Sequence, residues 1–510
     1  MRLSRIFFWI FAIFFVPLRA NCICPALFRR LPKWGWGVVV SNYMQNMNRI
    51  DTYYFIGIGG IGMSALARYM AAQGLRVLGY DRTSSPLTQR LESEGIQIAY
   101  DDRLDPLRTL DVATTVVVRT PAVPEDLAIY IYLREQGFRI LKRAELLGEL
   151  TRLQRALCVA GTHGKTTTST ILAHILHNAH IGASAFLGGI ANNYASNLII
   201  DKQSDWVVVE ADEFDRSFHH LSPHMSVITS MDPDHLDIYG TADAYADSFM
   251  HYAALVQEAL VIKADIAEHF MAAGHNLSAQ LYTYDVDKRA DFYADHIRVE
   301  DGQIYFDFHF LHNELHDIRL GVPVMVNIEN SVAAMALAYL AGATPDELRH
   351  GVESFAGVHR RFDIHIRRPE LTYIDDYAHH PQELAATIRS VRLLYPDSHV
   401  IAAFQPHLYS RTRDFVDDFA RVLSQLDEVA LLPIYPAREE PIAGVTSEWL
   451  MTKIHTKRVL ASPTSLPKYL RLRLQQCRES GQKLVVLTMG AGDIDRLVAP
   501  ITRNLTYKIF

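Results

Sequence analysis

The chain has 510 residues, of which 49% are hydrophobic and 21% are charged, as in an ordinary folded globular protein. This length exceeds what one hydrophobic core supports and predicts about three domains. The net charge of −7 excludes a general basic surface for nucleic acid, so local cations and helix N-termini must hold any anionic ligand.

The cysteines do not have the spacing of a disulfide framework or of a metal site. They are Cys22, Cys24, Cys158 and Cys477. A reducing compartment suits such a chain, and we expect it in the cytoplasm.

Residues 1–46 differ in character from the rest of the chain. Arg2 and Arg5 precede an apolar run, as in a secretory signal peptide, but no small-residue cleavage site follows. The run is shorter than the roughly 20 apolar residues that a membrane-spanning helix needs. We interpret the stretch as lying upstream of a true start at Met44 or Met47, or else as an uncleaved leader, and we expect no stable membrane anchor.

A strand-helix-strand pattern opens the first domain, expected over residues 47–153. An apolar strand at 53–56 leads into a Gly-rich turn and a helix at 63–73, and a second strand at 76–80 ends in an acid. The turn and the acid comprise Gly57, Gly59, Gly60, Gly62 and Asp81. Glycines at this spacing let a pyrophosphate approach the backbone. A nicotinamide dinucleotide and a nucleotide sugar diphosphate meet that requirement equally well.

A phosphate-binding loop opens the second domain, expected over residues 154–362. An apolar strand runs into Gly161-Thr162-His163-Gly164-Lys165-Thr166-Thr167-Thr168, and a helical pattern follows. The loop N–H groups and the helix dipole favour phosphate, Lys165 can reach the terminal phosphates, and Thr166 can contact Mg²⁺. Val159 replaces the first Gly of the generic motif, so an ordinary turn is the alternative to ATP binding.

Acidic side chains follow two further apolar strands of this domain. One strand ends in Glu210-Ala211-Asp212-Glu213, and the strand at 225–230 leads into Asp232-Pro233-Asp234-His235. The carboxyl ends of parallel strands meet at one sheet edge, where nucleotide sites hold Mg²⁺. A solvated strand end is the alternative for either cluster taken alone.

The third domain, expected over residues 363–510, repeats the pattern of apolar strands followed by polar or Gly-rich residues. Such junctions occur at Tyr373–Pro381, Val400–His407, Ser410–Arg413 and Leu487–Ile494. They predict a third open α/β sheet with ligand groups in the crevice at its strand ends.

Taken in order, these motifs resemble those of the Mur ligase family, the ATP-dependent amide-bond-forming enzymes of bacterial cell-wall precursor synthesis. The resemblance runs from about Met47 to the C-terminus and points to the branch that joins L-alanine to UDP-N-acetylmuramate. Its motifs are Gly57–Gly62, Gly161–Thr168, Glu210–Phe218, Asp234–Asp237, Arg360–Phe362, Asp375–Pro381, Phe404–His407 and Gly490–Asp493. It implies an α/β fold with an N-terminal Rossmann-like domain, a central P-loop ATPase-type domain and a C-terminal Rossmann-like domain.

The chemistry that the resemblance implies is activation of the muramyl carboxylate by ATP as an acyl phosphate, which the amine of L-alanine then attacks. The residues implied to be catalytic are Lys165, Glu210, His235 and Arg361. Those implied to bind ATP are Gly161, Thr162, His163, Gly164, Lys165, Thr166, Thr167, Asn327, Arg361 and Asp376. Mg²⁺, as two ions with Mn²⁺ as a substitute, would be held by Thr166, Glu210 and His235.

The same resemblance assigns the other two substrates to separate groups of residues. UDP-N-acetylmuramate would contact Gly57, Gly59, Gly60, Gly62, Asp81, Asn192 and Asn193. L-Alanine would contact Tyr377, His379 and Arg411. No macromolecular partner is implied, and no oligomeric state follows from the sequence.

Among the departures from the family pattern, those at Val326 and Leu408 affect candidate substrate contacts. Val326 stands where many members have His before the Asn327–Asn330 motif, which removes one candidate contact to the nucleotide. Leu408 follows Phe404–His407 where one branch has Arg, which weakens the case for direct recognition of the alanine carboxylate.

Other functions stay open on the sequence alone. A recycling ligase of the family would add a whole tripeptide to the same UDP-sugar, and the segment Phe404–Arg413 would decide between the acceptors. Folate and cyanophycin ligases share only the central domain. An NAD(P)-dependent dehydrogenase would give no role to Lys165 or His235, and a membrane-tethered nucleotide switch would not need Arg411. The sequence therefore favours the L-alanine ligase.

A chain that lacks residues 1–46 is expected to keep full ligase activity, because every motif of the family follows Met47. Phosphate release by the full-length and shortened chains, at equal concentration, checks this. Loss of folding in the shortened chain, detected by circular dichroism, would contradict it.

Overall fold

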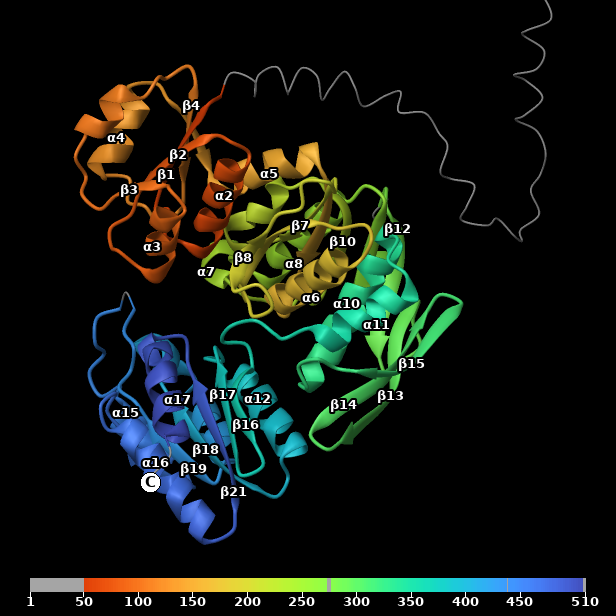
Figure 1. Ribbon diagram of the computed structural model, residues 1–510, viewed down its shortest axis with the longest axis vertical. Coiled ribbons are helices and arrows are strands. Elements are labelled where there is room, and N and C mark those ends of the chain that lie inside the picture. The colour runs from red at the N-terminus through yellow and green to blue at the C-terminus, as the bar shows by residue number, and fades with distance from the viewer. Residues whose placement is uncertain (1–49, 273–276, 438, 508–510) are drawn as a thin grey trace, which may run out of the picture. The chain divides into compact units, whose positions relative to one another are not determined.

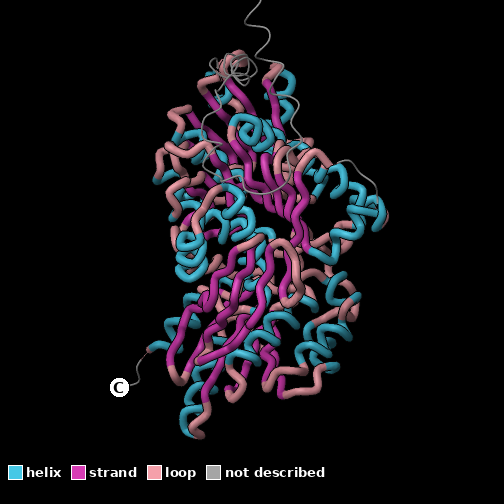
Figure 2. The backbone as a smooth tube through the Cα atoms, turned by 90° about the vertical axis from the view of Figure 1, so that its right-hand side faces the viewer, coloured by secondary structure: helices cyan, strands magenta, loops and turns pink. Residues whose placement is uncertain are grey.

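The computed structural model describes residues 50–272, 277–437 and 439–507. In these ranges the strands form three sheets with helices beside them, within one compact unit that begins at Asp51 (Figures 1 and 2). The segment 1–46 lies outside the described residues, so the expectation for its start codon is untested. None of the helices in the described ranges has the length and apolar character that crossing a membrane requires.

The first sheet is parallel and has the strand order β3-β2-β1-β4-β5. Its strands are β1 (Thr52–Ile56), β2 (Arg76–Tyr80), β3 (Gln97–Ala99), β4 (Thr115–Arg119) and β5 (Arg139–Lys142). Its helices are α2 (Ile61–Ala72), α3 (Pro86–Ser93), η2 (Asp105–Thr109), α4 (Ala128–Glu135) and α5 (Arg143–Leu153). The strand order reverses at β1, so the ligand crevice lies at the carboxyl end of β1, where the turn Gly57–Gly62 leads into α2.

The second sheet has the order β15-β14-β13-β12-β11-β10-β6-β9-β7-β8. Its strands are β6 (Arg155–Ala160), β7 (Ser184–Ala191), β8 (Ser196–Ile199), β9 (Trp206–Glu210), β10 (Pro223–Ile228), β11 (Ala259–Lys263), β12 (Gln280–Val286), β13 (Phe292–Glu300), β14 (Gln303–Phe310) and β15 (Asn313–Arg319). Its helices are α6 (Lys165–Asn178), η3 (Phe214–His220), α7 (Leu236–Tyr239), α8 (Ala242–Ala253), α9 (Ala264–Ala272), α10 (Met325–Ala341) and α11 (Pro345–Ser354). Strand β6 lies between β9 and β10, so the loops after these three strands share one sheet edge.

Two parts of the second sheet are antiparallel. Strands β13, β14 and β15 form a meander at one edge, and β8 pairs antiparallel with β7 at the other. Helices α6 and α10 pack against each other and supply apolar side chains, among them Ile171, Leu172, Val332 and Leu337, to the largest hydrophobic core (Figure 1).

The third sheet has the order β16-β17-β21-β18-β19-β20, parallel except for the edge strand β16. Its strands are β16 (Asp363–Arg368), β17 (Leu371–Asp376), β18 (Ser398–Phe404), β19 (Glu428–Leu431), β20 (Lys457–Leu460) and β21 (Lys483–Met489). Its helices are α12 (Pro381–Leu394), α13 (Tyr409–Asp414), α14 (Val416–Leu423), α15 (Ser447–Lys453), α16 (Leu466–Glu479), η4 (Asp493–Leu497) and α17 (Val498–Thr506). The acids and glycines after β17 and β21 therefore meet at one edge.

Helix α5 leaves the first sheet and lies directly against η3 of the second. Gly148, on α5, lies so close to the carbonyl group of His220 that an added Cβ would collide with it. We expect Gly148→Ala to lower the free energy of unfolding by about 1–3 kcal/mol, because two backbone segments would have to separate. Urea unfolding measures the loss, and Arg152→Ala, on an exposed position of the same helix, is the matched control. Equal stability of the two variants would contradict this packing.

Candidate active site

The phosphate-binding loop joins β6 to α6 in a tight turn. Gly161 has φ 131°, and a side chain there would collide with Thr229 on the neighbouring strand connection. The Lys165 ammonium group is folded back over the loop, where it donates to the backbone oxygens of Gly161 (2.7 Å) and Thr162 (3.2 Å). The loop thus holds the lysine at the N-terminus of α6, where the helix dipole favours anions.

Glu213 binds the same lysine from the segment after β9. Its Oε2 lies 2.8 Å from Lys165 Nζ, and its side chain is only 2% exposed. Burial raises the pKa of Glu213 above its ordinary value, while the charge and hydrogen bond of Lys165 lower it. The two side chains therefore form a buried ion pair.

Glu210 lies at the end of β9, opposite the first turn of α6. Its Oε1 accepts a hydrogen bond of 3.1 Å from Thr166 Oγ1, and its Oε2 is buried with no hydrogen-bond partner. Burial raises the pKa of Glu210, and Lys165 and Thr166 counteract that shift. A carboxylate oxygen with a free lone pair beside a hydroxyl group fits a hard cation such as Mg²⁺.

The phosphate-binding loop forms one wall of a cavity of about 390 Å³. The opposite wall includes Arg361, Asp376 and Glu383 from the C-terminal domain and its linker. The remaining side is lined by Val326 and Asn327 of α10. The structure thus brings together most of the residues predicted to bind ATP, namely Thr162, His163, Gly164, Lys165, Thr166, Thr167, Asn327, Arg361 and Asp376, together with Glu210.

The departure at Val326 has a visible consequence in this cavity. The Val326 side chain is 49% exposed although it is apolar, and it lies on the cavity wall beside Asn327. Asn327 itself is buried and its side chain donates to the carbonyl oxygen of Val322 at 3.3 Å. An apolar surface next to a buried amide suits the face of an aromatic ring better than a charged group.

The two acids on the wall formed by the C-terminal domain, Asp376 and Glu383, have pKa values shifted in opposite directions. Burial raises the pKa of Asp376 to about 6, although a hydrogen bond from Thr387 and the charge of Arg361 act against it. Burial would also raise the pKa of Glu383, but hydrogen bonds and charge from His379 lower it to about 2. The wall therefore combines one permanent anion with one carboxyl group that titrates close to neutral pH.

A second cavity, of about 410 Å³, lies at the Gly-rich turn after β1. Gly60 and Gly62 line it together with Lys142 and Arg143 at the start of α5. These cations face the acid-rich segment after β9: Arg143 lies 3.1 Å from Asp212, and Lys142 lies 3.6 Å from Asp215. A turn that exposes backbone N–H groups, with two cations beside it, can hold a diphosphate.

The other residues predicted to bind the UDP-sugar have structural partners. Asp81 accepts a hydrogen bond of 2.8 Å from the backbone N–H of Gly59 and so fixes the turn. Asn192 donates to Asp363 at 3.0 Å, and Asn193 donates to the carbonyl oxygen of Ser354 at 2.9 Å. The structure does not bring either asparagine into the cavity at the turn, so their contact with the sugar stays a prediction.

His235 also lies apart from the residues with which it was grouped. It has φ 52°, its ring packs edge-on against Phe214 with centroids 5.2 Å apart, and it does not line the cavity that contains Glu210. Phe214 in turn lines the cavity at the Gly-rich turn. The structure therefore places His235 beside Phe214, which belongs to the segment after β9. The role of His235 as a metal ligand stays a prediction.

The three residues predicted to bind the amino acid lie in a cluster with His407, which ends the motif Phe404–His407 and had no role assigned from the sequence. The rings of Tyr377 and His379 have centroids 5.2 Å apart, and His407 lies 5.8 Å beyond. Burial, with the charges of His379 and Arg411, lowers the pKa of His407 to about 4. One guanidinium nitrogen of Arg411, Nη1, is buried with no hydrogen-bond partner, which suits an incoming carboxylate.

Sequence reasoning gave no role to Lys142 and Arg143, and it named Glu213 and His407 only as members of motifs, without the contacts that they make here. Lys142 ends strand β5 of a parallel sheet and Arg143 begins the helix that follows, and this position is a signal that would have found them. The pairing of Glu213 with Lys165 joins residues from two strand ends and has no local signal.

Comparison with known proteins identifies the family. Three family models match successive parts of the chain: "Mur ligase family, catalytic domain" at residues 52–155, "Mur ligase middle domain" at 159–338 and "Mur ligase, glutamate ligase domain" at 360–492. A UDP-N-acetylmuramate–L-alanine ligase of Porphyromonas gingivalis is 53% identical over 459 residues, which cover 89% of this chain and 98% of the relative. The chain belongs to the Mur ligase family.

Solved structures of the family have the same fold. The UDP-N-acetylmuramate-alanine ligase MurC of Thermotoga maritima aligns with a TM-score of 0.73 and 25% identity, over 89% of this chain and 98% of that one. A murein peptide ligase of Psychrobacter arcticus aligns with a TM-score of 0.61 over 90% and 99% of the two chains, and its 22% identity is evidence for the fold alone. The three-domain α/β architecture predicted from the sequence is confirmed, while the boundaries at residues 153 and 362 stay predictions.

The raised pKa of Asp376 predicts a pH-dependent effect of Thr387→Val. Thr387 donates a 2.5 Å hydrogen bond that stabilises the charged form of Asp376. In the folded protein this acid takes up its proton at higher pH than in the unfolded chain, so its contribution to stability is greatest at low pH and is lost as pH rises through about 6. The lost hydrogen bond should therefore cost about 1.5–3 kcal/mol at about pH 8 and less at about pH 5.

Urea unfolding of the wild type and of Thr387→Val at the two pH values measures this difference. Ser390→Ala, which removes a hydroxyl bonded to a backbone carbonyl of the same helix, is the control that should not depend on pH. An equal cost of Thr387→Val at both pH values would mean that Asp376 is already charged at the lower one.

Proposed function

We propose that this chain is an ATP-dependent ligase that joins L-alanine to the carboxylate of UDP-N-acetylmuramate in peptidoglycan precursor synthesis. The observation that carries the proposal is the cavity that Lys165, Glu210 and Asp376 line together, in a chain that is 53% identical to a ligase of that name. The substrates, ATP and a UDP-sugar, belong to the cytoplasm, which we propose as the location.

The phosphates of ATP would bind at the N-terminus of α6. There the backbone N–H groups after Gly164 and the helix dipole stabilise negative charge, and Lys165 can exchange Glu213 for a phosphate oxygen. Thr166 and the free oxygen of Glu210 would hold Mg²⁺, which neutralises phosphate charge when it is bound. A second ion at His235, and Mn²⁺ as a substitute, are part of the same proposal.

The nucleoside would lie between α10 and the C-terminal wall. Asn327 and the apolar side chain of Val326 would contact the base or the ribose, and Asp376 would accept a hydrogen bond from a ribose hydroxyl group. Arg361 lies on the same wall. Its charge opposes the rise in pKa that burial causes in both Glu210 and Asp376. It can therefore stabilise the negative charge that develops on the phosphoryl group during transfer.

The UDP-sugar and the amino acid would approach from two other sides. The turn Gly57–Gly62, with Lys142 and Arg143, would hold the diphosphate and direct the muramyl carboxylate toward the γ-phosphate. Arg411 would pair with the alanine carboxylate through its free guanidinium nitrogen, which leaves the amine able to attack the acyl phosphate. Attack forms the amide bond and expels inorganic phosphate.

The deciding experiment is phosphate release by the full-length chain with ATP, Mg²⁺ and UDP-N-acetylmuramate, supplied with L-alanine, with the tripeptide L-Ala-D-Glu-diamino acid, or with neither. We expect release only when the sugar and L-alanine are both present. Release that depends on the tripeptide would identify a recycling ligase instead, and release with neither acceptor would mean that ATP hydrolysis is uncoupled from ligation.

Lys165→Ala is the control variant in this assay. It should lower turnover by at least about a thousandfold, because it removes the charge that stabilises the transferred phosphoryl group. Its affinity for the UDP-sugar, measured by calorimetry, should stay within a few-fold of the wild type, since the sugar cavity has its own cations. Loss of sugar binding as well would contradict the separate placement of the two sites.

A further inference from the structure

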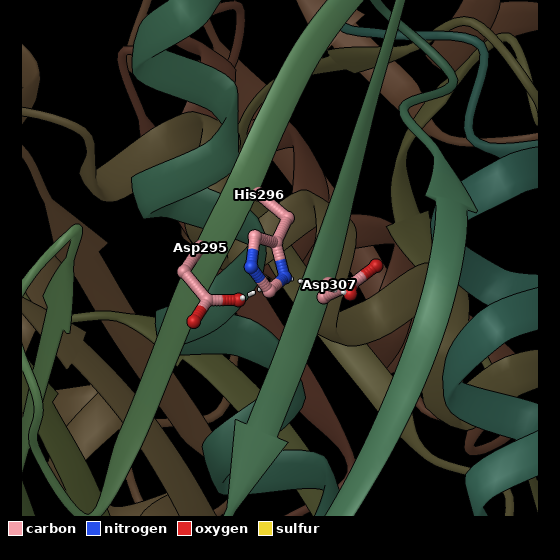
Figure 3. A group of neighbouring side chains, drawn as sticks. All are labelled: Asp295, His296 and Asp307. Atoms are coloured by element: carbon pink, nitrogen blue, oxygen red, sulfur yellow. Dashed lines mark hydrogen bonds and ion pairs between the residues drawn. The ribbon is translucent and has the colours of Figure 1, made fainter.

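A cluster of histidines and acids lies on the antiparallel meander of the second sheet, outside both cavities. The pairing of β13 with β14 is interrupted between Asp295 and Arg298, and the pairing of β14 with β15 shifts between Phe306 and Phe308. Asp307 therefore lies beside both irregularities. At the first of them His296 has φ 48° and turns its ring toward Asp307 (Figure 3).

The imidazole of His296 lies between two carboxylates. Its Nδ1 is 3.3 Å from Asp295 Oδ1 and 3.1 Å from Asp307 Oδ2 (Figure 3). One potential ligand atom from each of the three residues lies within 4.8 Å of the other two. Within the residues that the structure describes, this is the single group of three or more His, Cys, Asp or Glu side chains that meets that condition.

The separations suit ligands of one metal ion. Two ligands bound at about 2.1 Å to the same ion are about 3.0 Å apart in an octahedral site and about 3.4 Å apart in a tetrahedral one. The observed separations of 3.1 and 3.3 Å lie in this interval. An ion could therefore enter with small side-chain rotations.

Neighbouring groups hold the carboxylates in place. Asp307 is nearly buried, and its Oδ1 accepts a 2.8 Å hydrogen bond from the backbone N–H of Asp317, which leaves Oδ2 directed at the histidine. Asp295 is fixed by His309, whose Nε2 lies 2.8 Å from Asp295 Oδ1. Supporting contacts of this kind orient the ligands of metal sites in proteins. A further imidazole, that of His316, lies 2.8 Å from Asp307 Oδ2 and can approach as a fourth ligand.

We propose that Asp295, His296 and Asp307 bind a divalent first-row transition metal ion, Zn²⁺ in particular, that links β13 to β14 where their hydrogen bonding is interrupted. The imidazole ligand selects for Zn²⁺ and against Mg²⁺, which prefers oxygen ligands only. The site is thus chemically distinct from the proposed Mg²⁺ site at Thr166 and Glu210. A set of hydrogen bonds and ion pairs without metal is the alternative.

Calorimetric titration of the full-length chain with ZnCl2, in excess Mg²⁺ to saturate oxygen-only sites, tests the proposal. We expect one Zn²⁺ to bind per chain at this site, in addition to any ion that the proposed site at His235 takes up. His296→Gln should weaken binding at least about tenfold, because it removes the nitrogen ligand. His312→Gln, at an exposed position in the turn between β14 and β15, is the matched control and should leave the affinity unchanged.

Titration with CoCl2 should produce a visible d–d absorption band in the wild type and in His312→Gln but not in His296→Gln.

Several outcomes would overturn the proposal. They are the absence of stoichiometric binding, competition by Mg²⁺, or equal affinity of the wild type and His296→Gln. Asp295→Asn is the second variant, because it keeps the shape of a partly exposed side chain and should also weaken binding. Circular dichroism of each variant separates loss of a ligand from loss of folding.

Discussion

The acids in the segment Glu210–Asp215, at and after the end of β9, each need a hydrogen-bonding or charged partner, and this need constrains the arrangement of the whole active site. The pairs are Glu210 with Thr166, Asp212 with Arg143, Glu213 with Lys165 and Asp215 with Lys142. Glu213 is the most demanding of these acids, because a buried carboxylate without a partner costs several kcal/mol. Its partner must come from the phosphate-binding loop, so β6 and β9 must be neighbours and their loops must leave the same sheet edge.

The C-terminal domain is attached by a second buried ion pair. Arg360, in the linker before β16, lies 3.2 Å from the fully buried Asp375 and also donates to the carbonyl oxygens of Gly490 and Gly492. One guanidinium group thus ties the linker to the ends of β17 and β21. The next linker residue, Arg361, and the last residue of β17, Asp376, both line the cavity at the phosphate-binding loop. The contacts that fix the linker therefore also position two of the residues proposed to bind ATP.

Sequence patterns predicted the parts of the structure that have local causes. The strands before Gly57 and Gly161 were predicted from apolar runs and turn glycines, and they are present as β1 and β6. The meander β13–β15 was not predicted, because its strands mix polar and apolar residues and join the sheet only through tertiary pairing. The pairing of Glu213 with Lys165 and the attachment of Asn193 to α11 likewise depend on segments far apart in sequence, for which the pattern holds no local signal.

The segment after β9 belongs to two binding cavities at once. Glu213 partners the lysine of the cavity at the phosphate-binding loop, while Asp212 and Asp215 partner the cations of the cavity at the Gly-rich turn. A phosphate that draws Lys165 away leaves Glu213 without its countercharge, and a diphosphate that draws Arg143 away does the same to Asp212. If the two cavities bind these ligands as proposed, each ligand would change the electrostatic cost of accepting the other through residues 212–215. Such reciprocal linkage would make the affinity for each substrate depend on the other through this short stretch of backbone.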